Sequence, residues 1–372
     1  MIWTRKFLTK ISAWFNKKPL TPLDETLRFP ITSNEFFSLI KEEYGISFKN
    51  PLIIYNGYFY FRSYKDYFFQ LLIQPRTCLI CWRLLREIKK AKICWEQNVE
   101  IFLNEFDQLK HKDLSALSNS ELFKHIQETI KFDACWMFKL GFGLPIIYHY
   151  LLETILNFLY RLLVKDKNTQ NYHELLAGYP NKREEADLAF WEVVKGDLTL
   201  DDYLEKYGLR ATDASLIVPT IGENREDMQM RVDAFRNISL LDFEEIREKL
   251  LKTRNLREEY VSKNFRFWVP FGKKIFNNIL RTTREYAPIR ETRRFYYTKG
   301  SYLIRKAVLL LGERFKFLEK SDDIFFLTKD EIEREVLQPG TIDKEKIKGE
   351  IIKRRKQWQE RSEHTPLEQI KL

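Results

Sequence analysis

The chain has 372 residues, 44% of them hydrophobic, which is enough for one large core or two modest ones, so we expect a soluble folded protein. Its 63 basic and 53 acidic residues give a formal net charge of +10. Charges of both signs alternate within the same segments, most densely at 249–257 and 345–356. This mixing indicates solvated helix faces with i,i+4 pairs and argues against nucleic-acid binding, which would favour one basic block.

An amphipathic helix is predicted at the N-terminus, over residues 2–18. Its apolar side holds Ile2, Trp3, Phe7, Leu8, Ile11, Trp14 and Phe15, and its basic side holds Arg5, Lys6, Lys10, Lys17 and Lys18. Such a helix docks on the protein's own body, on a partner subunit, or on a membrane surface as a peripheral contact. The segment lacks the cleavage site and long apolar core of a signal peptide, so we expect no secretion.

The fold class expected is mainly α, a multi-helix domain or domains with a small β-hairpin near the N-terminus. Segments 52–55 and 58–61 flank Asn56-Gly57, a strong hairpin turn signal. Beyond Pro75, apolar periodicity with few turn signals predicts successive helices. We divide the chain into an N-terminal segment 1–74 with the amphipathic helix and hairpin, a helical substrate-pocket block 75–164, and a helical linker block 165–372. The polar stretch 165–171 separates the two helical blocks.

Four cysteines, Cys78, Cys81, Cys94 and Cys135, lie within apolar helical patterns beside tryptophans. The Cys78-x-x-Cys81 spacing suits zinc, but residues three apart on a helix are simply neighbours. We expect the four cysteines to be small buried apolar side chains that bind no metal, and the protein to reside in a reducing, cytoplasmic setting.

Residues 140–164 are long and apolar enough to span a membrane. However, His149, Glu153, Asn157 and Arg161 recur every four positions and form one polar stripe, which lipid would not tolerate. We therefore expect a buried helix whose stripe lines a substrate cavity. One alternative is that Glu153 and Arg161 only pair with neighbouring helices. A weaker alternative is that the segment inserts into a membrane, together with the N-terminal helix, at the cost of placing the stripe in hydrocarbon.

Several motifs in the second half of the chain resemble one family. They are Arg290-Glu291-Thr292-Arg293-Arg294-Phe295-Tyr296, Ile304-Arg305, Leu310-Leu311-Gly312-Glu313-Arg314 and Asp322-Asp323-Ile324-Phe325-Phe326-Leu327-Thr328. Together they are similar to the R-E-D-x-R-F-Y, L-G-x-R-L and D-D-I-F-F-L-T runs of phosphoenolpyruvate synthase-like phosphotransferases, above all the rifampicin phosphotransferase branch. Independently of the resemblance, Asp322-Asp323 lies between two helical patterns, and we expect its carboxylates to accept from backbone N–H groups there.

Further pieces follow in the family's order. They are Pro19-Leu20-Thr21-Pro22-Leu23, Asn56-Gly57-Tyr58-Phe59-Tyr60, Leu176-Ala177-Gly178 with 184–191, and Tyr207-Gly208-Leu209-Arg210 with Pro219 and Glu223. The last resembles a Y-G-H-R-G-x-x-E-x-D motif in which Leu209, Ala211, Asp213 and Ser215 replace histidine, glycine, glutamate and aspartate.

The resemblance implies the central part of a family member. A complete enzyme adds an ATP-grasp domain and a swivelling domain with a phosphorylated histidine. No glycine-rich phosphate cradle occurs in the sequence, and none of its five histidines lies in a Gly/Ser-rich turn. We therefore expect no cofactor on this chain, with ATP and Mg bound by partner chains that carry the ATP-grasp and phosphohistidine domains.

The function expected from this resemblance is the substrate-binding and linker component of a split phosphotransferase, inactive alone, with a small apolar substrate near 140–164. The expected substrate-binding residues are those of the stripe together with Arg210, Arg290 and Arg294, the arginines orienting phosphate or holding an interface. No catalytic residue is expected on the chain. The alternative, favoured by the departures at Leu209, Ala211 and Ser215, is a non-catalytic binding or scaffold protein derived from the same module.

Overall fold

The computed structural model describes residues 7–10, 17–45, 47, 52–62, 77–236, 243–266, 271–367 and 369–371. The helices are α1 (Phe29–Tyr44), α3 (Thr77–His111), α4 (Asn119–Trp136), α5 (Leu144–Leu163), α6 (Lys182–Lys195), α7 (Leu200–Tyr207), α8 (Arg225–Arg236), α9 (Phe243–Lys263), α10 (Gly272–Tyr297), α11 (Gly300–Arg314), α12 (Lys329–Leu337) and α13 (Lys344–Glu363). Shorter helical turns are η1 (Asp24–Arg28), η2 (Met137–Phe142), η3 (Thr169–Leu176) and η4 (Ser321–Phe326).

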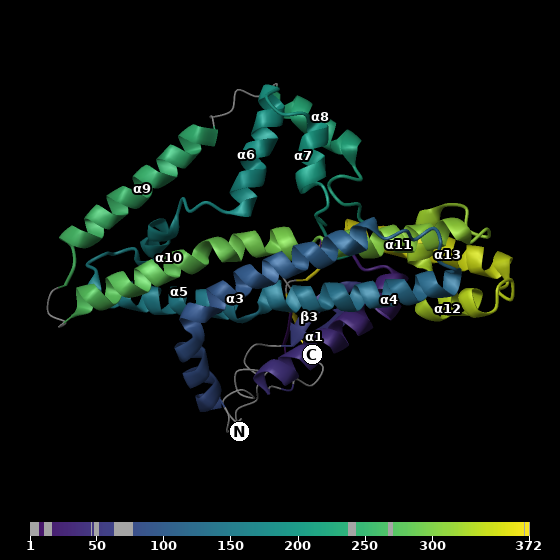
Figure 1. The fold of residues 1–372 in the computed structure, drawn as a ribbon, viewed down its shortest axis with the longest axis horizontal. Helices are drawn as coiled ribbons and strands as arrows, with labels where there is room; N and C mark the ends of the chain where they lie inside the picture. Colours follow the sequence, from purple (N-terminus) through teal and green to yellow (C-terminus); the bar gives the residue numbers. More distant parts are fainter. Residues whose placement is uncertain are drawn as a thin grey trace.

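The helices form an elongated body, as the mainly α prediction states (Figure 1). Helix α10 packs on α5, and α11 packs on α4. Helices α6, α7 and α8 stand on one side of the layer that contains α10 and α11, and α12 and α13 lie at one end of the body (Figure 1).

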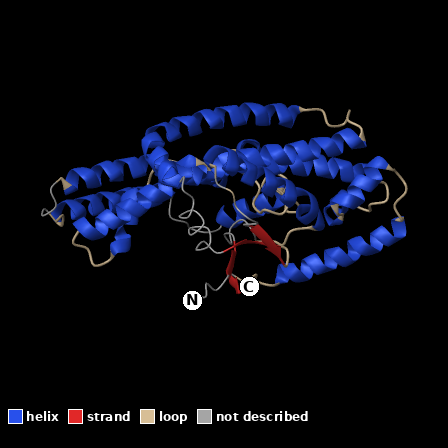
Figure 2. Cartoon of the chain, turned by 90° about the horizontal axis from the view of Figure 1, so that it is seen from below, coloured by secondary structure: helices blue, strands red, loops and turns tan. Residues whose placement is uncertain are grey.

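The predicted hairpin is confirmed. Strands β2 (Leu52–Tyr55) and β3 (Tyr58–Arg62) pair antiparallel around the Asn56-Gly57 turn, where both residues have positive φ. Two further strands, β1 (Phe7–Lys10) and β4 (Gln369–Lys371), complete a sheet of order β2-β3-β1-β4. The sheet therefore joins both ends of the chain, beside which Figure 2 places it.

The N-terminal helix prediction is wrong for Phe7–Lys10, which form β1. Their backbone groups pair with β3 on one side and β4 on the other, so long-range pairing overrides the local helical periodicity. Of the rest of the predicted helix, residues 2–6 and 11–16 lie outside the described residues, and Lys17 and Lys18 form a bend. The partner strand at residues 369–371 lies more than three hundred residues away, so the local sequence gives no sign of it.

Three apolar clusters hold the helices together. The first lies mainly between α3, α5, α6, α7 and α10, the second between α4, α11, η4, α12 and α13, and the third between the C-terminal half of α5, η3, α9 and the start of α10. The first cluster contains residues from both predicted helical blocks, on either side of the 165–171 boundary. The three-part division of the chain stays a prediction.

Local signals begin several helices. Ser118 forms a capping box with Glu121 at α4, and Thr328 forms one with Glu331 at α12. Of the acidic pair before α12, Asp323 accepts a backbone hydrogen bond of 3.0 Å, from the N–H of the preceding Lys320, whereas Asp322 contacts the guanidinium of Arg355 at 3.5 Å.

Helix α5 is packed against α10 and α3, but it is not buried all round. Tyr148, Leu152, Leu156 and Tyr160 are at most 2% exposed, whereas Phe158 is 64% exposed. Within the described residues, the run Asn119–Leu163 contains a window of mean hydropathy 1.3 that is long and apolar enough to cross a membrane, a test that the core helix of a soluble protein also passes. The buried helix expected here is therefore observed on one face only.

The cysteine prediction needs one correction. Cys94 is exposed on α3, because its position on that helix faces away from the first cluster that Ala91 and Trp95 join. Cys135 is partly buried. Cys78 and Cys81 lie in α3, but their side chains are outside the described set.

Candidate functional site

The polar stripe of α5 does not act as one unit. His149 is 1% exposed, and its Nε2 lies 3.3 Å from Oε2 of Glu153. Glu153 in turn contacts Nδ1 of His173 at 3.3 Å, the guanidinium of Arg290 at 3.9 Å and the hydroxyl of Tyr172 at 3.4 Å. The His149 contact, aided by Arg290 and His173, holds the pKa of Glu153 below its usual range despite burial. Burial and the Glu153 carboxylate raise the pKa of Tyr172 to about 12.

The other half of the stripe is separate. Arg161 donates to Asn157 at 3.0 Å, and Arg161 is exposed. Three cavities in the described part of the chain are lined by residues outside the stripe. The stripe therefore ties α5 to η3 and α10 through Glu153, as the pairing alternative states, and a cavity at the stripe stays a prediction.

The three predicted arginines do not converge either. Arg290 lies with Glu153 and also contacts Glu291 at 3.0 Å. Arg294, one turn further along α10, lies beside the phenol of Tyr297, whose pKa is raised by burial and partly lowered by the neighbouring arginines. Arg210 belongs to a different group.

That group contains two basic side chains that contact Phe295, near the junction of α10 and α11, and two lysines whose charges act on Lys299. The Nζ atom of Lys299 lies 4.7 Å from the ring centroid of Phe295 and 5.8 Å from that of Phe106 on α3. The guanidinium carbon of Arg210 lies 5.4 Å from the same Phe295 centroid. Two cations thus share one aromatic ring, a contact that stabilises positive charge without neutralising it. We call Lys299, Arg210, Lys110 and Lys182 the cationic cluster.

The electrostatic environment of Lys299 is unusual. Burial, together with the charges of Arg210, Lys110 and Lys182, lowers its pKa to about 8. Its ammonium group makes no hydrogen bond or ion pair with any described residue; the carboxylate of Glu185 instead holds Lys182 at 2.6 Å. The cluster therefore has positive charge in excess of its carboxylates.

Arg210 is held in place by the backbone. Its Nε donates to the carbonyl of Tyr207 at 3.3 Å, and the next residue, Ala211, donates its N–H to the carbonyl of Thr298 at 3.4 Å. This second bond links the loop after α7 to the turn that carries Lys299. Burial lowers the pKa of Arg210, while Tyr203 and Asp187 oppose this shift.

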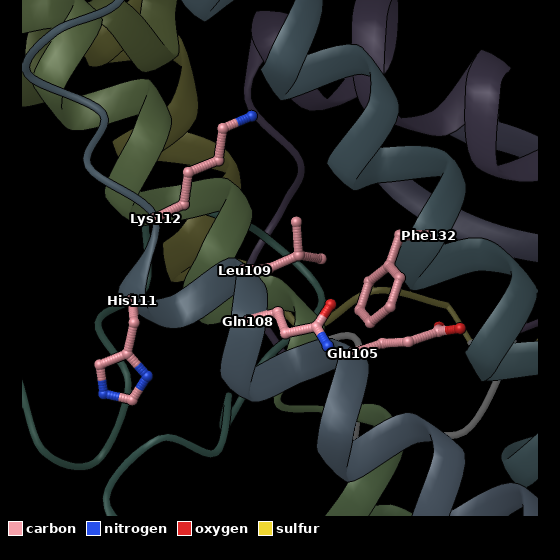
Figure 3. Close-up of a pocket in the computed structure, with 6 residues that line it drawn as sticks. All are labelled: Glu105, Gln108, Leu109, His111, Lys112 and Phe132. Atoms are coloured by element: carbon pink, nitrogen blue, oxygen red, sulfur yellow. The ribbon is translucent and has the colours of Figure 1, made fainter.

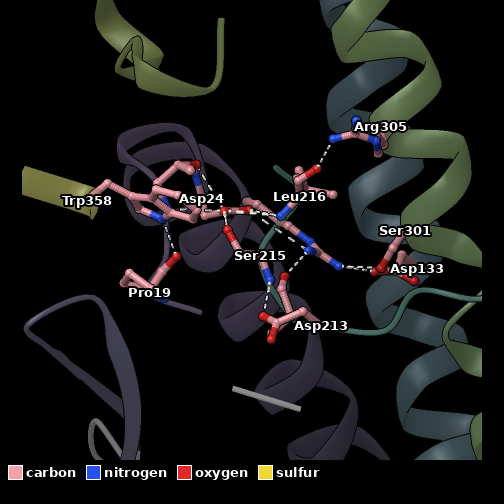
Figure 4. Close-up of polar contacts among 12 residues, drawn as sticks. Pro19, Asp24, Asp133, Asp213, Ser215, Leu216, Ser301, Arg305 and Trp358 are labelled. Carbon is pink, nitrogen blue, oxygen red and sulfur yellow. Dashed lines mark hydrogen bonds and ion pairs between the residues drawn. The ribbon is translucent and has the colours of Figure 1, made fainter. Parts of the chain in front are cut away.

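The loop that follows Arg210 rests on the N-terminal segment (Figure 4). Asp24 accepts hydrogen bonds from the Ser215 hydroxyl at 2.7 Å and from the Leu216 N–H at 3.2 Å. Asp213 accepts from the backbone N–H groups of Lys17 and Lys18 at 2.9 and 3.1 Å. Burial raises the pKa of Asp213, although these bonds oppose it.

A second set of bonds ties the same segment to α4 and α11. Arg28 donates to the carbonyl of Ala214 at 2.5 Å, to the Ser301 hydroxyl at 2.7 Å and to Asp133 at 3.3 Å. Burial raises the pKa of Asp133, and Arg28 counteracts this. Gly300 allows the close approach, because a Cβ there would lie 2.1 Å from Asp133 Oδ1.

The motifs of the expected family meet in this network. Arg305 donates to Glu223 at 2.8 Å and to the carbonyl of Leu216, and Trp358 donates to the carbonyl of Pro19 at 2.7 Å. Motif residues that are far apart in the sequence therefore lie in contact in the fold. The network holds the loop whose first residue, Arg210, enters the cationic cluster.

Three cavities in the described part of the chain have no residue of the cationic cluster in their lining. One, of about 570 Å³, is an open hollow between the C-terminal end of α3 and α4 (Figure 3). It is lined by Glu105, Gln108, Leu109, His111, Lys112 and Phe132. Its carboxylate, Glu105, is engaged by the indole N–H of Trp136 at 2.9 Å, and the rest of the lining offers no matched set of reactive groups.

Sequence reasoning missed Lys299, Lys110 and Lys182. Lysines are common on helical surfaces, and the residues Thr298-Lys299-Gly300 contain no pattern that predicts burial of the Lys299 side chain. The aromatic run that ends at Tyr297 was the only local signal, since it predicts a buried helix end.

Comparison with protein-family models and with curated proteins finds no match for the chain. The resemblance therefore stays an expectation, and a function has to be argued from the geometry of the chain itself.

Proposed function

We propose that the cationic cluster binds a phosphate- or carboxylate-bearing ligand, and that the chain is the substrate-binding and linker component of a cytoplasmic phosphotransferase. The ATP-grasp and phosphohistidine domains, with ATP and Mg, belong to other chains in this proposal. The observation that carries it is the environment of Lys299, whose ammonium has cations as its charged neighbours and no carboxylate partner among the described residues.

The physical argument concerns the free-energy cost of holding Lys299 charged beside other cations. A partly buried cation beside other cations is unfavourable unless something offsets the repulsion. A phosphoryl group does so, because its oxygens accept several charge-assisted hydrogen bonds from lysine and arginine at once. Phosphoryl transfer depends on such positioning and on charge stabilisation more than on covalent chemistry by the protein. The family resemblance, which singled out Arg210, adds support from the sequence.

The apolar acceptor expected near α5 has weaker support. His149 and Glu153 have the acid–base character that an alcohol acceptor requires, but His149 is fully buried and borders none of the three cavities described above. The proposal therefore places the anionic group at the cationic cluster and leaves the acceptor to the assembled complex.

Ligand binding is tested by the melting temperature of the purified chain as phosphate replaces chloride at constant ionic strength. We expect a saturable rise, since a ligand that binds only the folded state stabilises it. Arg210→Met should abolish the rise. Lys263→Met is the matched control, because Lys263 is an exposed cation on α9 that pairs only with Glu259. An equal response of all three proteins would show a general salt effect and contradict the proposal.

The partner chains are tested separately. A tagged full-length chain is recovered from its own cell extract, and the co-eluting proteins are identified by mass spectrometry. The proposal expects an ATP-grasp protein and a phosphohistidine protein, and addition of both should produce ATP consumption. Recovery of the chain alone would contradict the multi-chain enzyme.

A second candidate is a non-catalytic scaffold protein. The observation that favours it is that motif residues which differ from the family pattern are used internally. Asp213 accepts hydrogen bonds from the backbone of Lys17 and Lys18, and Ser215 donates to Asp24. Under this alternative, phosphate leaves the melting temperature unchanged and no ATP-grasp partner is recovered.

A further inference from the structure

We propose that Lys299 is a nucleophilic amine that forms an imine with small aldehydes or ketones carrying a phosphate or carboxylate group. This inference rests on the anion site proposed above and adds a covalent reaction to it.

Lys299 is a partly exposed residue in a turn whose backbone is held in place. It lies in the turn between α10 and α11, where its N–H bonds the Tyr296 carbonyl at 3.0 Å and its carbonyl accepts from Tyr302 at 3.0 Å. Gly300 follows directly and packs on Asp133, so the backbone of the turn is held on both sides. The side chain is partly exposed and reaches between Phe106 and Phe295. An amine held in this way meets a ligand in a defined orientation.

The amine of Lys299 is partly buried and faces cations from three neighbouring elements, and both factors disfavour its protonated form. Helix α3 contributes Lys110, α6 contributes Lys182, and the loop after α7 contributes Arg210, while the rings of Phe106 and Phe295 make cation–π contacts that oppose this effect. Burial together with adjacent cations is an established way to activate a lysine nucleophile.

The lowered pKa gives Lys299 far more neutral amine than an ordinary lysine has. With a pKa of about 8, roughly a quarter of the Lys299 amine is neutral at pH 7.5. An exposed lysine of ordinary pKa has on the order of 200-fold less neutral amine at that pH. The remaining cations, Arg210 above all, attract the anionic group of the ligand and so place its carbonyl carbon near this amine.

The reaction is a condensation. The lone pair of the neutral amine attacks the carbonyl carbon and gives a carbinolamine, a proton moves from nitrogen to the hydroxyl group, and one water molecule leaves. The product is the imine, and no redox partner takes part. Hydrolysis reverses the reaction, so a reducing reagent is needed to trap it.

The experiment uses pyridoxal 5′-phosphate, which carries both an aldehyde and a phosphate, with the full chain. After incubation at pH 8 and reduction with sodium borohydride, which delivers hydride to the imine carbon, modified lysines are located by peptide mass spectrometry. We expect Lys299 to be the main site, with a rate that rises with pH through about 8. Inorganic phosphate should slow labelling, and pyridoxal without phosphate should react at least tenfold more slowly.

Two variants control the measurement. Lys299→Arg keeps the positive charge and should remove the main label while leaving the circular dichroism spectrum unchanged. Lys263→Met should leave the labelling of Lys299 unchanged. Labelling spread over exposed lysines, with no preference for Lys299, would overturn the inference.

The outcomes also separate this inference from the anion site. If phosphate raises the melting temperature through Arg210 but Lys299 is not labelled, the amine reaction is refuted and the anion site stands. If pyridoxal and its phosphate label Lys299 equally and inorganic phosphate gives no protection, the anionic ligand class is refuted.

Discussion

Replacing Lys299 by methionine should stabilise the protein while removing its ligand affinity. Methionine keeps an unbranched apolar side chain against Phe106 and Phe295 but carries no charge. The wild-type ammonium is costly because it is desolvated and lies near Arg210, Lys110 and Lys182. A charged group that binds ligand can therefore lower the stability of the unliganded protein.

The magnitude follows from the pKa. The ordinary lysine value of 10.5 falls to about 8 in the folded chain, and each pH unit corresponds to about 1.4 kcal/mol, so the charge costs on the order of 3 kcal/mol at neutral pH. Between about pH 8 and 10.5 the unfolded chain binds more protons than the folded chain at this site. The cost is therefore fully present below about pH 8 and is relieved as the pH rises through that interval.

Urea unfolding measures this effect, followed both by circular dichroism and by tryptophan fluorescence to check that the two transitions coincide. At pH 7 we expect the free energy of unfolding of Lys299→Met to exceed that of the wild type by about 1 to 3 kcal/mol, which is roughly a third to all of the cost of the buried charge. By pH 10 this difference in stability should be smaller. Lys263→Met, which removes an exposed charge, should change stability by less than about 0.5 kcal/mol. A Lys299→Met protein that is no more stable than wild type at pH 7, or a gap that widens with pH, would refute the reasoning.

Other residues give independent predictions. Arg28→Met leaves the Asp133 carboxylate buried without its cation and should cost about 3 to 5 kcal/mol in urea unfolding, with partial recovery when Asp133→Asn is added; no recovery would contradict the pairing. Gly300→Ala should lower the melting temperature, because its Cβ would collide with Asp133, whereas Gly349→Ala, with open space in α13, should raise it slightly; equal effects would contradict the close approach. Glu153→Gln should lose stability at pH 7, since the lowered pKa of Glu153 stabilises the fold above about pH 4.5; the deficit should shrink as the pH falls below that value, and a deficit constant with pH would argue against a charge effect.

The sequence predicted the helical class and the hairpin well, because both depend on local signals. Apolar periodicity specifies a helix within a few turns, and Asn56-Gly57 supplies the positive φ that a tight hairpin turn needs. It failed at Phe7–Lys10, where the deciding interaction is pairing with β3 and β4. Local periodicity contains no information on such distant partners.

The candidate site was predicted only in part. Arg210 was chosen from a motif, and the structure places it in the cationic cluster, but its companions Lys110, Lys182 and Lys299 come from three other elements. The α5 stripe has the expected spacing, yet the packing of α10 and η3 decides that Glu153 pairs with Arg290 and His173. Which lysine is partly buried, and which carboxylate finds a cation, depend on tertiary contacts that no single stretch of sequence encodes.

The most direct test of the central claim is a crystal of the full chain soaked in tungstate, a heavy tetrahedral anion that substitutes for phosphate. Anomalous scattering from tungsten locates the anion without reference to any chosen ligand pose. The account predicts a peak beside Phe295, with anion oxygens at about 3 Å from the Lys299 ammonium and the Arg210 guanidinium. Tungstate bound only elsewhere on the surface, with that position empty, would contradict an anion site at the cationic cluster.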